Sequence, residues 1–216
     1  MPIRPEREYR SMELRSKEET REGEYIVEGY ATTFDSPYEL YRDGKYIVKE
    51  QVSRNAFDGT DMGDVIFQLN HEGNVFARTR NNSLTLEMDD HGLKTIANLG
   101  LTTQSREIWE GINTGLLDRM SFAFTVTEDS FKEEDQGDGN IVLTRSILRI
   151  GKLYDVSVVS MPANDQTSIS ARSKELFDGE IAKFEAERLH AQEIKELRTK
   201  ILNRLDHKEE QTDERD

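Results

Sequence analysis

The chain of 216 residues contains no cysteine, which excludes disulfide scaffolds, thiol nucleophiles and cysteine-ligated zinc sites. This composition fits a reducing compartment. Long hydrophobic runs are also missing, since no stretch approaches the roughly 20 apolar residues that span a bilayer as a helix. The N-terminal sequence MPIRPEREYR has no apolar signal-peptide core. We therefore expect a soluble, intracellular protein.

Basic residues are in the minority, with 29 Lys and Arg against 43 Asp and Glu and a net charge of −14. Nucleic acids and anionic membranes attract basic patches, so neither is expected as the main partner. The hydrophobic fraction is 35% and the charged fraction 33%, which is polar for a compact globule. The length suits one domain with a charged, extended appendage.

The pattern along the chain divides it into three segments. Residues 1–23 mix charges with few apolar residues and are predicted to form a solvated arm or an edge strand. Residues 24–172 have mainly β patterns and should form the domain. Residues 173–216 are highly charged, with apolar residues at helical spacing. We expect a helical tail there, which either lies on the domain surface or serves as a docking or oligomerisation arm.

Within the domain, the β patterns are short and separated by turn residues. The expected strands are 25–31, 46–48, 65–69, 84–88, 93–97, 119–127 and two within 141–159, broken near Gly151. The polar turn Asp89–Gly92 predicts a hairpin between two of them. Residues 102–113 are predicted to form a helix that Thr103 caps and Gly115 ends.

Three residues stand where reactive groups are expected. His71 follows the apolar strand 65–69, where a rigid scaffold can present a side chain to a cleft. Ser121 lies in an aromatic strand, and Asp155 is an acidic residue among apolar neighbours, which is costly unless it is paired. Each has an ordinary structural explanation by itself, such as an Asp155–Arg149 ion pair. Together they have the composition of a base, a nucleophile and an orienting acid.

Other kinds of site are not supported by the sequence. His71 lacks the second histidine of the zinc-protease motif, because position 75 is Val75. The loop 135–139 resembles half a calcium loop but lacks ligands at the alternate positions. Glycine-rich phosphate loops are absent, and Arg119 replaces the first glycine of an esterase-type G-x-S-x-G elbow around Ser121. We therefore expect no metal and no cofactor.

Four motifs follow one another between residues 24 and 170. They are Leu69-Asn70-His71-Glu72 with Ala77-Arg78, the Gly92-Leu93 hairpin, Gly115-Leu116-Leu117 leading into Met120-Ser121-Phe122-Ala123-Phe124, and Leu153-Tyr154-Asp155-Val156-Ser157-Val158-Val159 with Met161-Pro162-Ala163-Asn164. In order and approximate spacing they resemble the prohead (capsid maturation) proteases of tailed bacteriophages.

This resemblance implies a serine endopeptidase with an α+β, mainly β fold. Its core would be a β-barrel flanked by helices, like that of the herpesvirus assemblin protease, with a charged C-terminal helical arm. His71 matches the family's histidine, Ser121 its serine, and Asp155 its acidic position, which is usually glutamate. Assemblins use a second histidine in the third role, so His91 is the fallback. By analogy with assemblins, backbone N–H groups at 149–151 are the expected oxyanion donors.

The resemblance also implies partners and a location. The substrates would be the capsid scaffold, either a separate protein or an extension of the major capsid protein, and the protease itself. The enzyme would act inside the procapsid as it assembles in the host cytoplasm, with no nucleic-acid or membrane partner. The tail 173–216 would pack beside scaffold helices and be removed on maturation by autoproteolysis. The alternative is a non-enzymatic, β-rich capsid assembly or scaffolding module.

Overall fold

A computed structural model describes residues 7–16, 25–160 and 171–213. The chain divides into two compact units, Met1–Lys174 and Glu175–Asp216. The elements, in chain order, are β1 (Glu8–Ser16), β2 (Ile26–Thr33), β3 (Tyr38–Asp43), β4 (Tyr46–Val52), β5 (Ile66–Leu69), β6 (Glu72–Arg78), the 3-10 turn η1 (Thr79–Asn81), β7 (Leu84–Met88), β8 (Gly92–Asn98), α1 (Thr103–Asn113), β9 (Arg119–Asp135), β10 (Ile141–Val159) and α2 (Ala171–Asp213).

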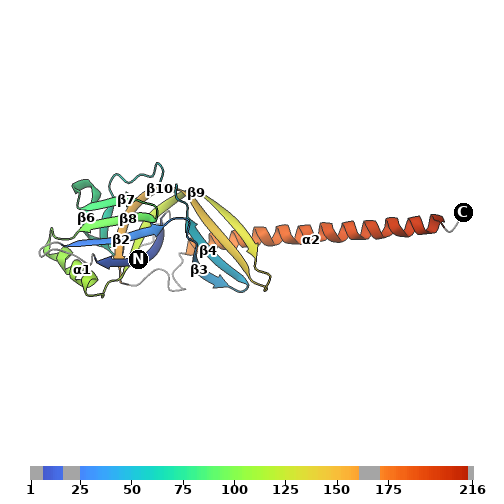
Figure 1. Cartoon of the computed structure of the whole chain (residues 1–216), viewed down its shortest axis with the longest axis horizontal. Helices are drawn as coiled ribbons and strands as arrows, with labels where there is room; N and C mark the ends of the chain where they lie inside the picture. Colours follow the sequence, from blue (N-terminus) through green and yellow to red (C-terminus); the bar gives the residue numbers. More distant parts are fainter. Residues whose placement is uncertain (1–6, 17–24, 161–170, 214–216) are drawn as a thin grey trace. The chain divides into compact units, whose positions relative to one another are not determined.

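The strands of the first unit follow one path of pairing, β3-β4-β10-β9-β1-β2-β8-β7, with β5 beside β10 and β6 beside β5 (Figure 1). The mainly β, α+β class predicted from the sequence is therefore confirmed. Closing a barrel requires the two end strands of the path to pair with each other. Within the described residues β3 and β7 each pair with one neighbour only, so the path is open and the expected closed barrel is not observed.

β10 is one strand of 19 residues where the sequence predicts two. The expected break near Gly151 is instead a series of register shifts against β9 between Ile147 and Asp155. Such shifts insert a residue and bend a strand without ending it. β10 therefore pairs in parallel with β4 along its first part and with β5 along its last part. The second pairing sets the position of the turn that follows β5.

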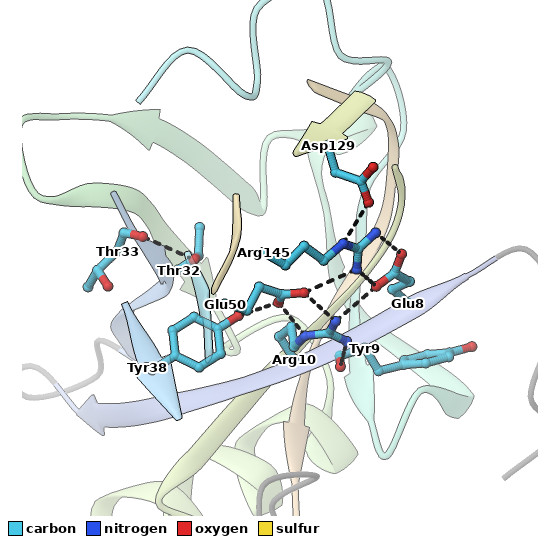
Figure 2. Close-up of polar contacts among 9 residues, drawn as sticks. All are labelled: Glu8, Tyr9, Arg10, Thr32, Thr33, Tyr38, Glu50, Asp129 and Arg145. Atoms are coloured by element: carbon cyan, nitrogen blue, oxygen red, sulfur yellow. Dashed lines mark hydrogen bonds and ion pairs between the residues drawn. The ribbon is translucent and has the colours of Figure 1, made fainter. Parts of the chain in front are cut away.

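β1 corrects the expectation of an N-terminal arm or edge strand, because it lies between β9 and β2 and pairs with both. The described charges at its start, Glu8 and Arg10, are paired instead of solvated. Arg10 donates to both carboxylate oxygens of Glu50 at 2.5 and 2.7 Å, and Arg145 donates to Glu8 at 2.6 Å (Figure 2). Glu50 is fully buried and Arg145 is 2% exposed. Buried ions are tolerated when they are paired and hydrogen-bonded, so this cluster lets a charged segment serve as an internal strand.

β9 has two different faces. Met120, Phe122 and Phe124 alternate along it and belong to the hydrophobic core. The rings of Phe122 and Phe124 stack with centroids 4.6 Å apart. Side chains alternate across a strand, so Ser121 and Ala123 lie on the opposite face from these core residues.

Capping residues define where α1 begins and ends. The Thr102 hydroxyl oxygen accepts from the Ser105 backbone N–H, and the Ser105 hydroxyl oxygen accepts from the Thr102 backbone N–H, so the cap is Thr102 and not Thr103. Gly115, with φ of 76°, ends the helix as predicted. In the described part of the chain, neither α1 nor α2 combines the length and apolar character needed to cross a membrane.

Candidate active site

His71 occupies the second position of the two-residue turn between β5 and β6. Leu69 pairs with Glu72 across this turn, and Asn70 and His71 have φ of 54° and 60°. Positive φ at both central positions is the arrangement of a type I′ turn, for which Asn-Gly is preferred. Histidine in place of that glycine costs on the order of 1–2 kcal/mol, and strain of this kind is concentrated at functional sites.

Asn70 attaches this turn to the end of β10. Its backbone N–H donates to the carbonyl of Val158 at 2.9 Å, and its side-chain oxygen accepts from the backbone N–H of Ser160 at 3.0 Å. The turn is thus held at both its backbone and its side chain. This attachment keeps His71 over the sheet face that carries Ser121.

The register of β9 and β10 brings the other two candidates to one face. Ser121 lies directly opposite Ser157, and Ala123 lies opposite Asp155. Directly opposed residues of antiparallel strands project from the same face, so Ser121, Asp155 and Ser157 share the face beneath His71.

His71 bridges the two strands by hydrogen bonds. Its Nδ1 lies 2.5 Å from Oδ1 of Asp155, and its Nε2 lies 2.8 Å from Oγ of Ser121. An ionised carboxylate only accepts hydrogen bonds, so Nδ1 carries the proton and donates it to Asp155. In the neutral ring, Nε2 then accepts from the Ser121 hydroxyl. The structure thus brings together all three candidates, in the order nucleophile, base and orienting acid.

The three side chains are shielded from solvent. Ser121 is fully buried, Asp155 is 1% exposed, and the His71 side chain is 5% exposed. A carboxylate in this position is costly unless hydrogen bonds stabilise it. Asp155 accepts a second bond, at 2.8 Å, from the hydroxyl of Ser157. The ordinary explanation of Asp155 as an ion-pair partner of Arg149 does not hold, because Arg149 faces Glu128 at 3.6 Å.

His91, the fallback for the third role, lies elsewhere. It is exposed in the turn between β7 and β8, where its backbone N–H donates to Asp89 at 2.7 Å. Its ring packs edge-on against Tyr30, with centroids 4.5 Å apart. The position beside Nδ1 of His71 belongs to Asp155.

The prediction that the backbone N–H groups at 149–151 are the oxyanion donors is wrong. Arg149 pairs with Glu128, seven residues along β9 from Ser121. At about 3.3 Å per residue, this separation is roughly 20 Å. The Ile150 N–H is already used, since it donates to the carbonyl of Ala56 at 2.7 Å. These groups are too far from Ser121 to contact an oxyanion formed there.

Two residues of the site were missed by sequence reasoning. Tyr9 on β1 packs its ring edge-on against His71, with centroids 4.6 Å apart. Tyr9 reaches the site because β1 pairs with β9, and nothing in the sequence of residues 1–23 indicates this pairing. Ser157 does have a signal, because it lies two residues after Asp155 on a strand and so shares its face.

Among the side chains that the structure describes, no group of three or more His, Asp or Glu residues could hold a metal ion. The half calcium loop at 135–139 is part of the connection between β9 and β10. There Asp135 and Asp138 accept hydrogen bonds from the backbone N–H groups of Gly137 and Asn140.

Comparison with protein families assigns the chain. Residues 10–180 match the family described as Caudovirus prohead serine protease, and this range includes His71, Ser121 and Asp155. The chain belongs to this family. The resemblance noted in the sequence is thereby confirmed, and it places this prohead protease family member among the serine peptidases of phage capsid maturation. Searches of curated proteins and of solved structures gave no match.

Proposed function

We propose that this prohead protease family member is a serine endopeptidase that cleaves the capsid scaffold and itself inside the maturing procapsid. The scaffold is either a separate protein or an extension of the major capsid protein. The observation that carries the proposal is the hydrogen-bonded chain from Ser121 through His71 to Asp155. The mainly β core supports the implied kinship with assemblin, although its strand path is open.

The mechanism follows from the hydrogen-bond directions. As Oγ of Ser121 attacks a peptide carbonyl, Nε2 of His71 takes its proton, and Asp155 stabilises the resulting imidazolium. The imidazolium then gives this proton to the leaving amine as the peptide bond breaks, leaving an acyl ester on Ser121. Water, deprotonated by Nε2 of His71, then attacks the ester carbonyl. As the ester bond breaks, the imidazolium returns this proton to Oγ of Ser121 and the acid product is released.

Autoproteolysis is the second part of the proposal. The second unit consists of the charged helix α2, and every described side chain from 185 to 204 is exposed. A cleavage between the units would release this helix without cutting a strand. The active protein should therefore lose C-terminal mass on incubation, while Ser121→Ala stays at full length. Intact mass spectrometry that finds both proteins at full length would contradict autoproteolysis.

Co-expression with the capsid or scaffold protein tests the main proposal. The wild-type chain should produce cleaved capsid or scaffold, and Ser121→Ala should leave it intact. Ser146→Ala is a matched control, because Ser146 lies on β10 and bonds to Gln51 away from the site. Equal cleavage by wild type and Ser121→Ala would show that Ser121 is not the nucleophile.

A non-enzymatic capsid assembly module is the second candidate, and the complete burial of Ser121 favours it. A substrate carbonyl reaches Oγ only after the surrounding side chains move. A serine-directed phosphonate separates the two functions. Covalent labelling of Ser121 in the wild type, lost in His71→Ala, supports the peptidase, whereas absence of labelling together with intact capsid protein supports the assembly module.

A further inference from the structure

Ser157 has a hydroxyl that the proposed reaction does not use. It is fully buried on β10, two residues beyond Asp155 and directly opposite Ser121 on β9. Its Oγ donates to Oδ1 of Asp155 at 2.8 Å. Because a hydroxyl has a single proton, this bond prevents Ser157 from donating to Ser121.

The acceptor atom is the same one that His71 uses. Oδ1 of Asp155 lies 2.5 Å from Nδ1 of His71 and 2.8 Å from Oγ of Ser157. An aspartate carboxylate rotates in a broad, two-fold torsional well, so one donor leaves its orientation loosely defined. Two donors from separate elements, the β5–β6 turn and β10, define the plane of the carboxylate.

The two donors differ in what happens to them during the proposed reaction. His71 alternates between a neutral and a charged ring, whereas Ser157 stays neutral on the strand that carries Asp155. The Ser157 bond therefore holds the carboxylate in place while the charge of its other donor changes. Ser157 is not an alternative nucleophile, since Nε2 of His71 bonds to Ser121.

We propose that Ser157 is a positioning residue that acts on the reaction through Asp155, by directing Oδ1 at Nδ1 of His71. The effect on the rate rests on the proposed peptidase function. The effect on the His71–Asp155 hydrogen bond does not, so the two can be tested separately.

The first measurement needs no activity. In a Ser121→Ala background, which cannot cleave itself, proton NMR observes the downfield Nδ1–H resonance of His71. Adding Ser157→Ala should shift this resonance and increase its exchange with water, and Ser146→Ala should leave it unchanged. An unchanged shift and exchange rate in Ser157→Ala would overturn the proposal, whether or not the wild-type protein is a peptidase.

A second pair of variants controls for shape. Thr and Val have nearly the same shape and differ by a hydroxyl, so Ser157→Thr should keep the wild-type resonance and Ser157→Val should lose it. Equal spectra from the folded Thr and Val variants would contradict a role for the hydroxyl. If neither Ser157→Thr nor Ser157→Val folds, because each side chain is larger than serine, Ser157→Ala provides the test, since it requires no additional space.

Kinetics gives the rate effect. A hydrogen bond to a charged group contributes enough that Ser157→Ala should lower kcat roughly 10- to 100-fold with KM unchanged. In an Asp155→Asn background the same change should have less than about a twofold effect, because residues that act through one another are not additive. A further loss of 10-fold or more in that background would show that Ser157 does not act through Asp155. If the wild-type protein cleaves nothing but the His71 resonance still shifts in Ser157→Ala, the proposed peptidase function is wrong and the positioning role of Ser157 stands.

Discussion

The position of one imidazole depends on two residues with left-handed backbone conformations. Asn70 and His71 have φ of 54° and 60°, and Asn70 binds the end of β10 through both its backbone and its side chain. Histidine pays a conformational cost in this position that glycine would not. The result is a ring that contacts Ser121 on β9 and Asp155 on β10 at once. A strained backbone residue at this point is consistent with the catalytic role proposed for it.

The first prediction concerns the nucleophile and the base. Ser121→Ala and His71→Ala should each lower kcat by on the order of 10⁶, and the double variant should be no slower than either, because such residues act as a unit. Steady-state cleavage of a peptide from the scaffold junction measures this. Additive losses in the double variant would contradict a shared role.

The second prediction concerns the carboxylate. Asp155→Asn removes the charge and allows the wrong ring tautomer, so kcat should fall by roughly 10⁴. Asp155→Glu keeps the charge but adds a methylene at a site that is 1% exposed. It should lose less activity than Asp155→Asn. The opposite order in a kcat comparison would show that the charge of Asp155 is not what matters.

At the scale of elements, β1 is an internal strand because of one buried cluster. Arg10 and Arg145 lie among Glu8, Glu50 and Asp129, and Tyr38 donates to Glu50 at 2.7 Å (Figure 2). These residues come from five strands, so the cluster ties β1 to β3, β4, β9 and β10. β1 in turn pairs with β9 alongside Ser121. The cluster therefore supports the site from a distance.

The third prediction tests this cluster. Arg10→Met leaves Glu50 buried with fewer partners and should lower the free energy of unfolding by about 3–5 kcal/mol. Arg42→Met, which removes an exposed pair with Glu39, should lower it far less, because solvent screens a surface ion pair. Denaturant unfolding measures both. Equal losses would show that the buried pairing contributes no more than a surface pair.

The fourth prediction is a pH dependence at Glu8. Burial alone would raise the pKa of this carboxyl, but the hydrogen bond from Arg145 and the charges of Arg10 and Arg145 outweigh it, so the pKa is lowered from 4.5. A lowered pKa adds stability above the unfolded-state value, and this stability is lost as the pH falls through the folded-state value. The melting-temperature difference between wild type and Glu8→Gln should be largest near neutral pH and shrink below about pH 4.5. A melting-temperature difference that stays constant from neutral pH to about pH 3 would contradict this prediction.

At the scale of the whole molecule, the chain consists of a β unit and a helical unit that differ in burial. The first contains the core and the site, whereas every described side chain of α2 from 185 to 204 is exposed, with Leu189, Leu197 and Ile201 among them. Helices that bury no apolar face gain little from tertiary packing. The end of the helix therefore contributes little to the stability of the β unit.

The fifth prediction follows from that exposure. A chain ending at Arg188 should unfold within about 0.5 kcal/mol of the full-length protein, since exposed residues contribute little to stability. Its peptide cleavage should also be unchanged. Unfolding curves and peptide kinetics measure the two effects. Loss of stability or of activity would show that the removed segment contributes more than the exposure of residues 189–204 predicts.

The sequence by itself determined the chemistry available to this protein. The absence of cysteine excluded a thiol nucleophile, and four ordered motifs pointed to the family and to His71, Ser121 and Asp155 as candidate site residues. The hairpin at Asp89–Gly92 and the end of α1 at Gly115 were also predictable, because turn and cap residues act locally.

Only the tertiary structure decided the contacts between distant segments. In the structure β1 pairs with β9 and the path of strand pairing stays open. Ser157 lies opposite Ser121, and Tyr9 packs against His71. These features depend on strand register and on pairing between residues far apart in the chain, which local propensity does not specify. The charges of β1 predicted a solvated arm because their partners are distant in sequence. Glu50, the partner of Arg10, is 40 residues away, and Arg145, the partner of Glu8, is 137 residues away, so these pairs form only when the sheet forms.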